Sequence, residues 1–158
     1  MKKHFIYIVL FALVLGACEK DDLCLSSTTP KLILRFYDSA DNTKFKAVSN
    51  LSIKAESKTD SLYTNQVVDS IAIPLNVNGT QTIYHLKTSS TGNIADNKYN
   101  KLTLNYTTEE VYISRSCGFK TIFKNVTVAS DNGWFQSFTP NSITSIDNEN
   151  NAHIKIFH

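Results

Sequence analysis

Apolar side chains recur at every second position through most of this sequence, and this period of two constrains the fold more than any other feature. Leu32, Leu34 and Phe36, for example, are separated by single residues of the opposite face. Successive side chains of a β-strand point to opposite faces of its sheet, so the period predicts strands with one buried face. No window of about 12 residues shows helical spacing with capping residues. Closely spaced strands with exposed Ser, Thr and Asn predict an all-β fold, an antiparallel β-sandwich of immunoglobulin-like or related topology.

Two further segments in the first half of the chain alternate in the same way. Residues 51–55 form one of them, and residues 71–77 form the other. Pro74 cannot donate a ladder hydrogen bond, so the second segment is expected at a sheet edge or with a bulge. The dipeptide Asn78-Gly79 is typical of a type I′ turn, which predicts a hairpin between residues 71–77 and residues 82–87.

The second half of the chain begins with a strand expected at residues 102–107. Residues 108–110 (Thr-Glu-Glu) predict a turn, and residues 111–115 predict the strand that follows it. The exposed pair Glu109-Glu110 is expected to face water in that turn.

The last strands are expected at residues 119–129 and residues 152–157. In the first of these, Phe123 occupies an odd position, whereas Val126 occupies an even one. The two residues cannot share a face of a regular strand, so the pattern predicts a β-bulge near residues 124–125.

Residues 1–17 have the parts of a signal peptide: a basic start at Lys2 and Lys3, an apolar run at residues 5–15, and two small residues. The apolar run of about 11 residues is well short of the roughly 20 that a helix needs to cross a bilayer. Residues 15–18 (Leu-Gly-Ala-Cys) resemble a bacterial lipobox, in which the cysteine, here Cys18, is acylated before cleavage. The alternative is an ordinary secretory signal followed by a chance cysteine.

Lipidation of Cys18 anchors a chain without any membrane-spanning segment. Each buried methylene contributes roughly 0.8 kcal/mol, so two or three acyl chains hold stably where one does not. Lys20, Asp21 and Asp22 follow the cysteine and resemble the surface-export signal of Bacteroidetes lipoproteins. The alternative is a merely polar tether on the periplasmic leaflet. We expect an outer-membrane protein at the cell surface, with a signal peptide at 1–17, a lipidated tether at 18–30 and a β-sandwich domain at 31–158.

The chain has three cysteines, which in an exported protein normally leaves one thiol to explain. Lipidation accounts for Cys18, so Cys24 and Cys117 remain as an even pair in an oxidising compartment. The sequence therefore predicts a Cys24–Cys117 disulfide. A redox or nucleophilic role for Cys117 needs a nearby base, and the charged neighbours Arg115 and Lys120 are poor candidates.

Charge and composition exclude several kinds of function. The 16 basic residues exceed the 14 acidic ones only because of Lys2 and Lys3, and removal of the signal peptide leaves 14 of each. A nucleic-acid partner therefore has no electrostatic support. The mature histidines His85, His153 and His158 lack metal-site spacing. No nucleophile elbow or phosphate loop occurs, so we expect a non-enzymatic protein without metal or cofactor.

Trp134, Phe135 and Phe138 gather in one segment, residues 131–140, beside several amide side chains. Aromatic faces flanked by amides stack on sugars or grip peptides, because the rings supply area and the amides supply direction. The alternative is that these large rings close one end of the sandwich. The sequence leaves both interpretations open.

Several motifs occur in a distinctive order: residues 18–24 (Cys-Glu-Lys-Asp-Asp-Leu-Cys), 29–38, 117–120 (Cys-Gly-Phe-Lys) and 153–156. Together they resemble a Bacteroidetes lipoprotein family of unknown function over nearly the whole mature chain. The resemblance implies no activity, and it supports the disulfide because both cysteines lie in its motifs. We expect a lipid-anchored cell-envelope protein that binds or assembles partner proteins; the alternative is a surface lipoprotein that binds carbohydrate through the Trp134 segment.

Overall fold

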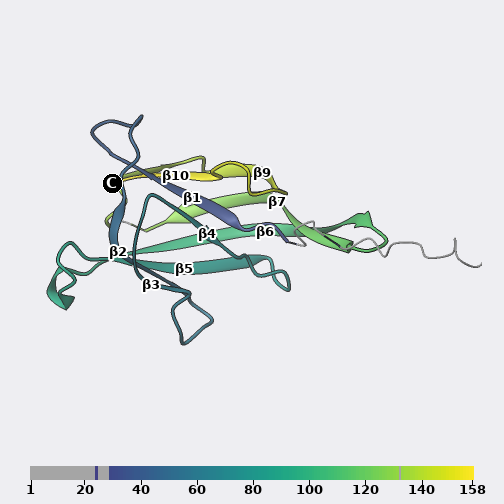
Figure 1. The fold of residues 1–158 in the computed structure, drawn as a ribbon, viewed down its shortest axis with the longest axis horizontal. Coiled ribbons are helices and arrows are strands. Elements are labelled where there is room, and N and C mark those ends of the chain that lie inside the picture. Colours follow the sequence, from purple (N-terminus) through teal and green to yellow (C-terminus); the bar gives the residue numbers. More distant parts are fainter. Residues whose placement is uncertain (1–23, 25–28, 132) are drawn as a thin grey trace, which may run out of the picture.

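The computed structural model describes residues 24, 29–131 and 133–158, which build two β-sheets packed face to face (Figure 1). The four-stranded sheet has the order β4 (Ser70–Ile73), β1 (Leu32–Tyr37), β10 (Ile154–Phe157), β8 (Ser137–Thr139). The six-stranded sheet has the order β3 (Tyr63–Val68), β2 (Val48–Ala55), β5 (Gln81–Thr88), β6 (Lys98–Ser114), β7 (Gly118–Ser130), β9 (Ser142–Ile146). One short 3₁₀ helix, η1 (Ile94–Asp96), precedes β6. The predicted all-β sandwich is confirmed.

The core lies between the sheets and follows the period of two. Leu32, Leu34 and Phe36 of β1 are fully buried, and Leu102 and Leu104 of β6 meet them from the other sheet. Because alternate residues supply this core, a slip of one position in any strand would turn its buried face to solvent. The alternation therefore specifies the register as well as the strands.

One strand pair departs from the expected antiparallel arrangement. β1 and β10 run parallel, with Leu34 opposite Ile154, while every other pair of strands in the described residues is antiparallel. Parallel neighbours need a long connection, and here almost the whole domain separates the two strands. His153 reinforces the start of this pair, since its N–H donates to the Ile33 carbonyl and its Nδ1 accepts from the Ile33 N–H at 2.9 Å.

The predicted hairpin between residues 71–77 and residues 82–87 is wrong. β4 pairs with β1 in one sheet, whereas β5 pairs with β2 and β6 in the other, so the chain crosses between the sheets after Ile73. Neither Asn78 nor Gly79 has the positive φ that a type I′ turn requires. Pro74 follows β4, which is indeed an edge strand.

Tyrosine hydroxyls hold this crossover in place and explain why the local turn signal fails. The Tyr84 hydroxyl donates to the Pro74 carbonyl, and the Tyr106 hydroxyl donates to the Asn76 carbonyl at 2.8 Å. Burial raises the pKa of Tyr84 to about 12, so its proton remains available for donation. These bonds and the burial of Leu75 fix the segment to the core.

The predicted turn at residues 108–110 is also wrong, because β6 runs without interruption through them. Thr108, Glu109 and Glu110 pair with Phe123, Ile122 and Thr121 of β7. The β-branched and aromatic cross-strand partners favour extended backbone over a turn here. The chain turns instead between Ser114 and Gly118, and the predicted bulge near residues 124–125 is confirmed by a register shift and by a φ of 51° at Asn125.

Candidate functional site

The two ends of the sandwich hold the residues that the sequence singled out. β6 and β7 form a long hairpin that extends beyond the other strands, and the C-terminus lies at the opposite end (Figure 1). The predicted signal peptide, the predicted lipidation site Cys18 and the predicted export signal at residues 20–22 lie outside the described residues.

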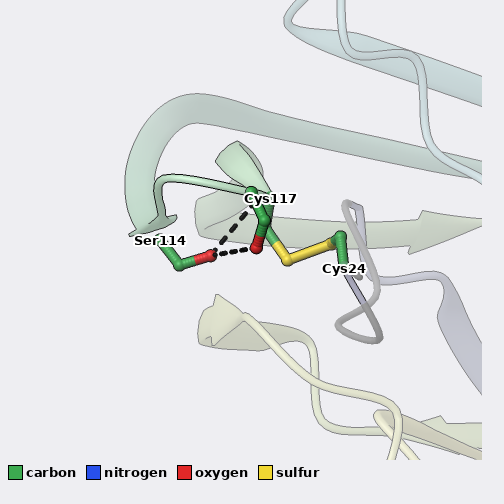
Figure 2. The surroundings of a disulfide bond; sticks show 4 residues. Cys24, Ser114 and Cys117 are labelled. Carbon is green, nitrogen blue, oxygen red and sulfur yellow. Dashed lines mark hydrogen bonds between the residues drawn. A yellow bond between two sulfur atoms is a disulfide. The ribbon is translucent and has the colours of Figure 1, made fainter. Parts of the chain in front are cut away.

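The predicted disulfide is present at the turn of the β6–β7 hairpin. The sulfurs of Cys24 and Cys117 are 2.02 Å apart and the α-carbons 4.9 Å apart (Figure 2). The turn is built to hold Cys117: Ser114 Oγ accepts a hydrogen bond from the Cys117 N–H at 3.1 Å, and Gly118 has a φ of +68°, which glycine adopts without strain. The segment that precedes the domain is thus tied to the hairpin tip.

Two exposed rings flank this turn. Tyr112 of β6 lies opposite Phe119 of β7, and their ring centroids are 5.4 Å apart in an edge-on contact. Tyr112 is 56% exposed and Phe119 is 61% exposed. Directly opposed residues of an antiparallel pair share one face, so the two rings form a continuous apolar surface, which we call the tip pair.

The Trp134 segment packs into the core at the other end. Trp134 and Phe135 are both less than a tenth exposed, and the Trp134 ring lies 6.0 Å from the ring of Phe36. Trp134 Nε1 donates to the Leu86 carbonyl at 3.3 Å. Phe138 lies on β8, half-buried against the core. The two largest rings therefore have no free face for a sugar to stack on, and the geometry supports the packing alternative.

Asn100 explains the path of that segment. Its Nδ2 donates to the Asp131 carbonyl at 2.8 Å, and its Oδ1 accepts from the Phe135 N–H at 2.9 Å. A Cβ on Gly133 would come within 2.0 Å of the Tyr99 carbonyl oxygen, so only glycine allows this approach. The sequence reasoning missed Asn100, whose only signal is a polar residue that interrupts the inward-facing positions of β6.

An open hollow of about 650 Å³ lies beside the Trp134 segment, at the end of the molecule where β6 begins. The C-terminal His158 contributes to its wall: Lys46 Nζ donates to the His158 carbonyl at 2.9 Å, and a His158 ring nitrogen lies 3.2 Å from the Lys46 carbonyl. Both cationic and aromatic groups reach the hollow, which is lined among others by Lys46, Asp96, Lys98, Tyr99, Trp134 and His158. Such a lining suits a polar ligand.

The structure does not bring His85, His153 and His158 together at one site. His85 lies on β5, His153 precedes β10 and His158 ends the chain. Within the described residues, no group of three or more His, Cys, Asp or Glu side chains could hold a metal ion.

The free energy of unfolding is expected to decrease as the pH falls below about 6.5, because the folded domain disfavours the protonated form of His153. Burial lowers the pKa of His153 from 6.5, although Asp147 and Glu149 oppose the shift. The unfolded chain therefore binds the proton more tightly, so the stabilisation is complete above pH 6.5 and is lost as the pH falls through the folded pKa. Protonation of Nδ1 also breaks the bond from Ile33. Urea unfolding across this range measures the effect.

The variant His153→Gln provides the control, because its amide oxygen can accept the Ile33 hydrogen bond without titrating. Burial also lowers the pKa of His158, so the variant should show a shallower dependence on pH rather than none. An unchanged dependence would exclude His153 as a source.

Comparison with known proteins identifies a family but no characterised relative. Residues 50–158 match a family of unknown function, DUF6452. No curated protein and no solved structure gives a significant match. The part of the chain that the structure describes contains no helix long and apolar enough to cross a membrane.

Proposed function

Because this chain belongs to the DUF6452 family of unknown function, we propose its role from the site itself: it is a lipid-anchored protein of the bacterial cell envelope, and its β-sandwich is a non-enzymatic binding or assembly module. Cys18 carries the lipid, and residues 18–30 tether the domain.

 The single observation that carries the proposal is the pairing of Cys24 with Cys117, which leaves Cys18 as the one cysteine outside the disulfide.

The sequence around Cys18 supports lipidation. The cysteine follows the apolar run and the small residues Gly16 and Ala17, and the domain's first strand begins at Leu32. A polar stretch thus separates the proposed lipid from the first strand. A structural disulfide between Cys24 and Cys117 also fits an exported protein, since such bonds persist in oxidising compartments and are rare in the cytosol.

Lys20, Asp21 and Asp22 support display on the outer face of the outer membrane, and their resemblance to a Bacteroidetes export signal supports an origin in that group. Protease added to intact cells tests the location. The native chain should be cleaved, and a variant with Asp21→Ala and Asp22→Ala should be protected on the periplasmic leaflet. Equal cleavage of the two proteins would exclude the export signal.

Binding is the role that the surface supports best. The hollow beside the Trp134 segment lies where β6 begins, and the disulfide lies just beyond the end of β6. A strand rises about 3.3 Å per residue, so roughly 50 Å of β6 separates the two. An anchor at one end leaves the other free to meet a partner.

The carbohydrate alternative has less support, because the Trp134 and Phe135 rings are buried. A glycan array with the purified domain tests it directly.

Replacing Cys18 by serine is expected to abolish incorporation of labelled fatty acid and to leave an unprocessed or soluble protein, because acylation needs the thiol. Cys24→Ser is the matched control, since it changes the same atom six residues away and should keep the label. Labelling followed by membrane fractionation measures both variants. Normal membrane retention of Cys18→Ser would contradict the proposed anchor.

A further inference from the structure

The tip pair, Tyr112 and Phe119, forms exposed apolar surface at the end of the β6–β7 hairpin. An exposed ring is common on proteins, but two large rings in contact and each more than half exposed form a patch. Their mutual contact supports the pairing of the two strands, and it leaves more than half of each residue exposed. The opposite sheet cannot cover them, since its strands have only three to six residues against the 17 of β6.

The disulfide places this patch near the proposed lipid. Cys24 lies six positions after Cys18, and a fully extended chain of that length spans about 21 Å at most. Cys24 is bonded to Cys117, with 4.9 Å between the α-carbons, and Phe119 follows two residues later. Whatever path the tether takes, the hairpin tip therefore remains close to the bilayer that holds the acyl chains.

The chemistry of the tip suits the boundary between lipid and water. Tyrosine combines an apolar ring with a polar hydroxyl and is enriched at this boundary in membrane proteins. Arg115 is exposed in the turn between the two rings, where its guanidinium can donate to a lipid phosphate. Glu110, also exposed, lies two residues before Tyr112 and must stay in water, so the contact is shallow and ends at the tip.

From these observations we propose that the tip pair, Tyr112 and Phe119, rests in the headgroup region of the bilayer that carries the lipid anchor. The inference rests on the proposed lipidation of Cys18, which it deepens by assigning an orientation. The hairpin tip faces the membrane, and the hollow beside Trp134 faces away from it. Two side chains are enough for this contact because the tether is short, which keeps the effective concentration of the hairpin tip at the bilayer surface high.

The test compares one tryptophan placed at the tip with one at the other end of the same strand. Tyr112→Trp probes the tip, and Tyr99→Trp is the matched control because Tyr99 is 59% exposed, close to the 56% of Tyr112. About 43 Å of strand separates the two positions. The native Trp134 is buried and adds the same background to both. The full lipidated chain is reconstituted into phosphatidylcholine vesicles with or without brominated phosphatidylcholine, which quenches tryptophan on contact.

We expect brominated lipid to cause a loss of emission from the Tyr112→Trp variant and none from the Tyr99→Trp variant. If brominated lipid changes the emission of the two variants equally, or of neither, while the protein floats with the vesicles, the inference is overturned and the anchor stands. Protein that carries no lipid and does not float would overturn both. If a partner protein covers the tip instead, acrylamide will not quench the Tyr112→Trp variant in native membranes, and brominated lipid will not quench it in vesicles. That pair of results would overturn the lipid assignment.

Discussion

Replacing Trp134 by alanine is expected to lower the free energy of unfolding by about 3 to 5 kcal/mol. The ring fills one end of the core against Phe36 and Phe135, and its Nε1–H bonds to the Leu86 carbonyl. Truncation would leave a cavity and remove the hydrogen bond from the indole to that carbonyl. Urea denaturation of the purified domain measures the loss.

Tyr99→Ala serves as the control for that measurement, because it removes an exposed ring near the same hollow. Its effect should stay near the roughly 0.5 kcal/mol typical of surface substitutions. If Trp134→Ala were as mild as Tyr99→Ala, the ring could not be a core residue, and a role in ligand binding would regain support.

Removing the disulfide is expected to cost about 2 to 5 kcal/mol without changing the architecture. The bond closes a loop with a sequence separation of 93, for which loop entropy alone accounts for about 4 to 5 kcal/mol. The alternating core residues, rather than the crosslink, specify the sheets. The double variant Cys24→Ala, Cys117→Ala should therefore keep its far-UV spectrum and unfold at a lower urea concentration.

Reductant gives an independent check on the same bond. Treatment of the native domain should lower its unfolding midpoint to that of the double variant, and the variant itself should not respond. A double variant as stable as the oxidised protein would show that the disulfide adds nothing to stability. A helical or unfolded far-UV spectrum of the double variant would show that the disulfide is needed to specify the fold.

The local period of two predicts the core strands well, because burial on one sheet face repeats within a few residues. β1 and β10 follow directly from Leu32 to Phe36 and from Ile154 and Ile156. β3 gives no such signal, since none of its residues is fully buried and four of the six are exposed. An edge strand of this kind is held by its neighbour's backbone, which no local pattern encodes.

Pairing between strands is harder to predict than the strands themselves. Asn78-Gly79 favours a hairpin locally, but the hydrogen bonds from Tyr84 and Tyr106 act across the fold and take the chain to the other sheet. Tertiary contacts outweigh the turn preference in this segment. The signal for them lies in tyrosine hydroxyls on β5 and β6, outside the turn itself, so the dipeptide at residues 78–79 does not reveal it.

Of the candidate sites, the disulfide could be predicted from the sequence and the tip pair could not. Counting cysteines is enough to predict Cys24–Cys117, because only one pair remains once Cys18 is assigned. The tip pair escapes prediction, since Phe119 shares the odd positions of the buried Phe123. Whether such a residue is covered depends on the length of the facing sheet, which alternation in its own strand does not reveal.

The bond at the hairpin turn also decides how the domain bears mechanical load. A pull on the chain before Cys24 enters the fold at Cys117 and runs along the axes of β6 and β7. Hydrogen bonds between antiparallel strands lie perpendicular to the strands, so those joining β6 to β5 and β7 to β9 are loaded in shear, many at a time. With the disulfide reduced, the same pull would reach the domain through β1 and would strain its ladders with β4 and β10 instead. One covalent bond therefore directs tension into the longest strands of the molecule.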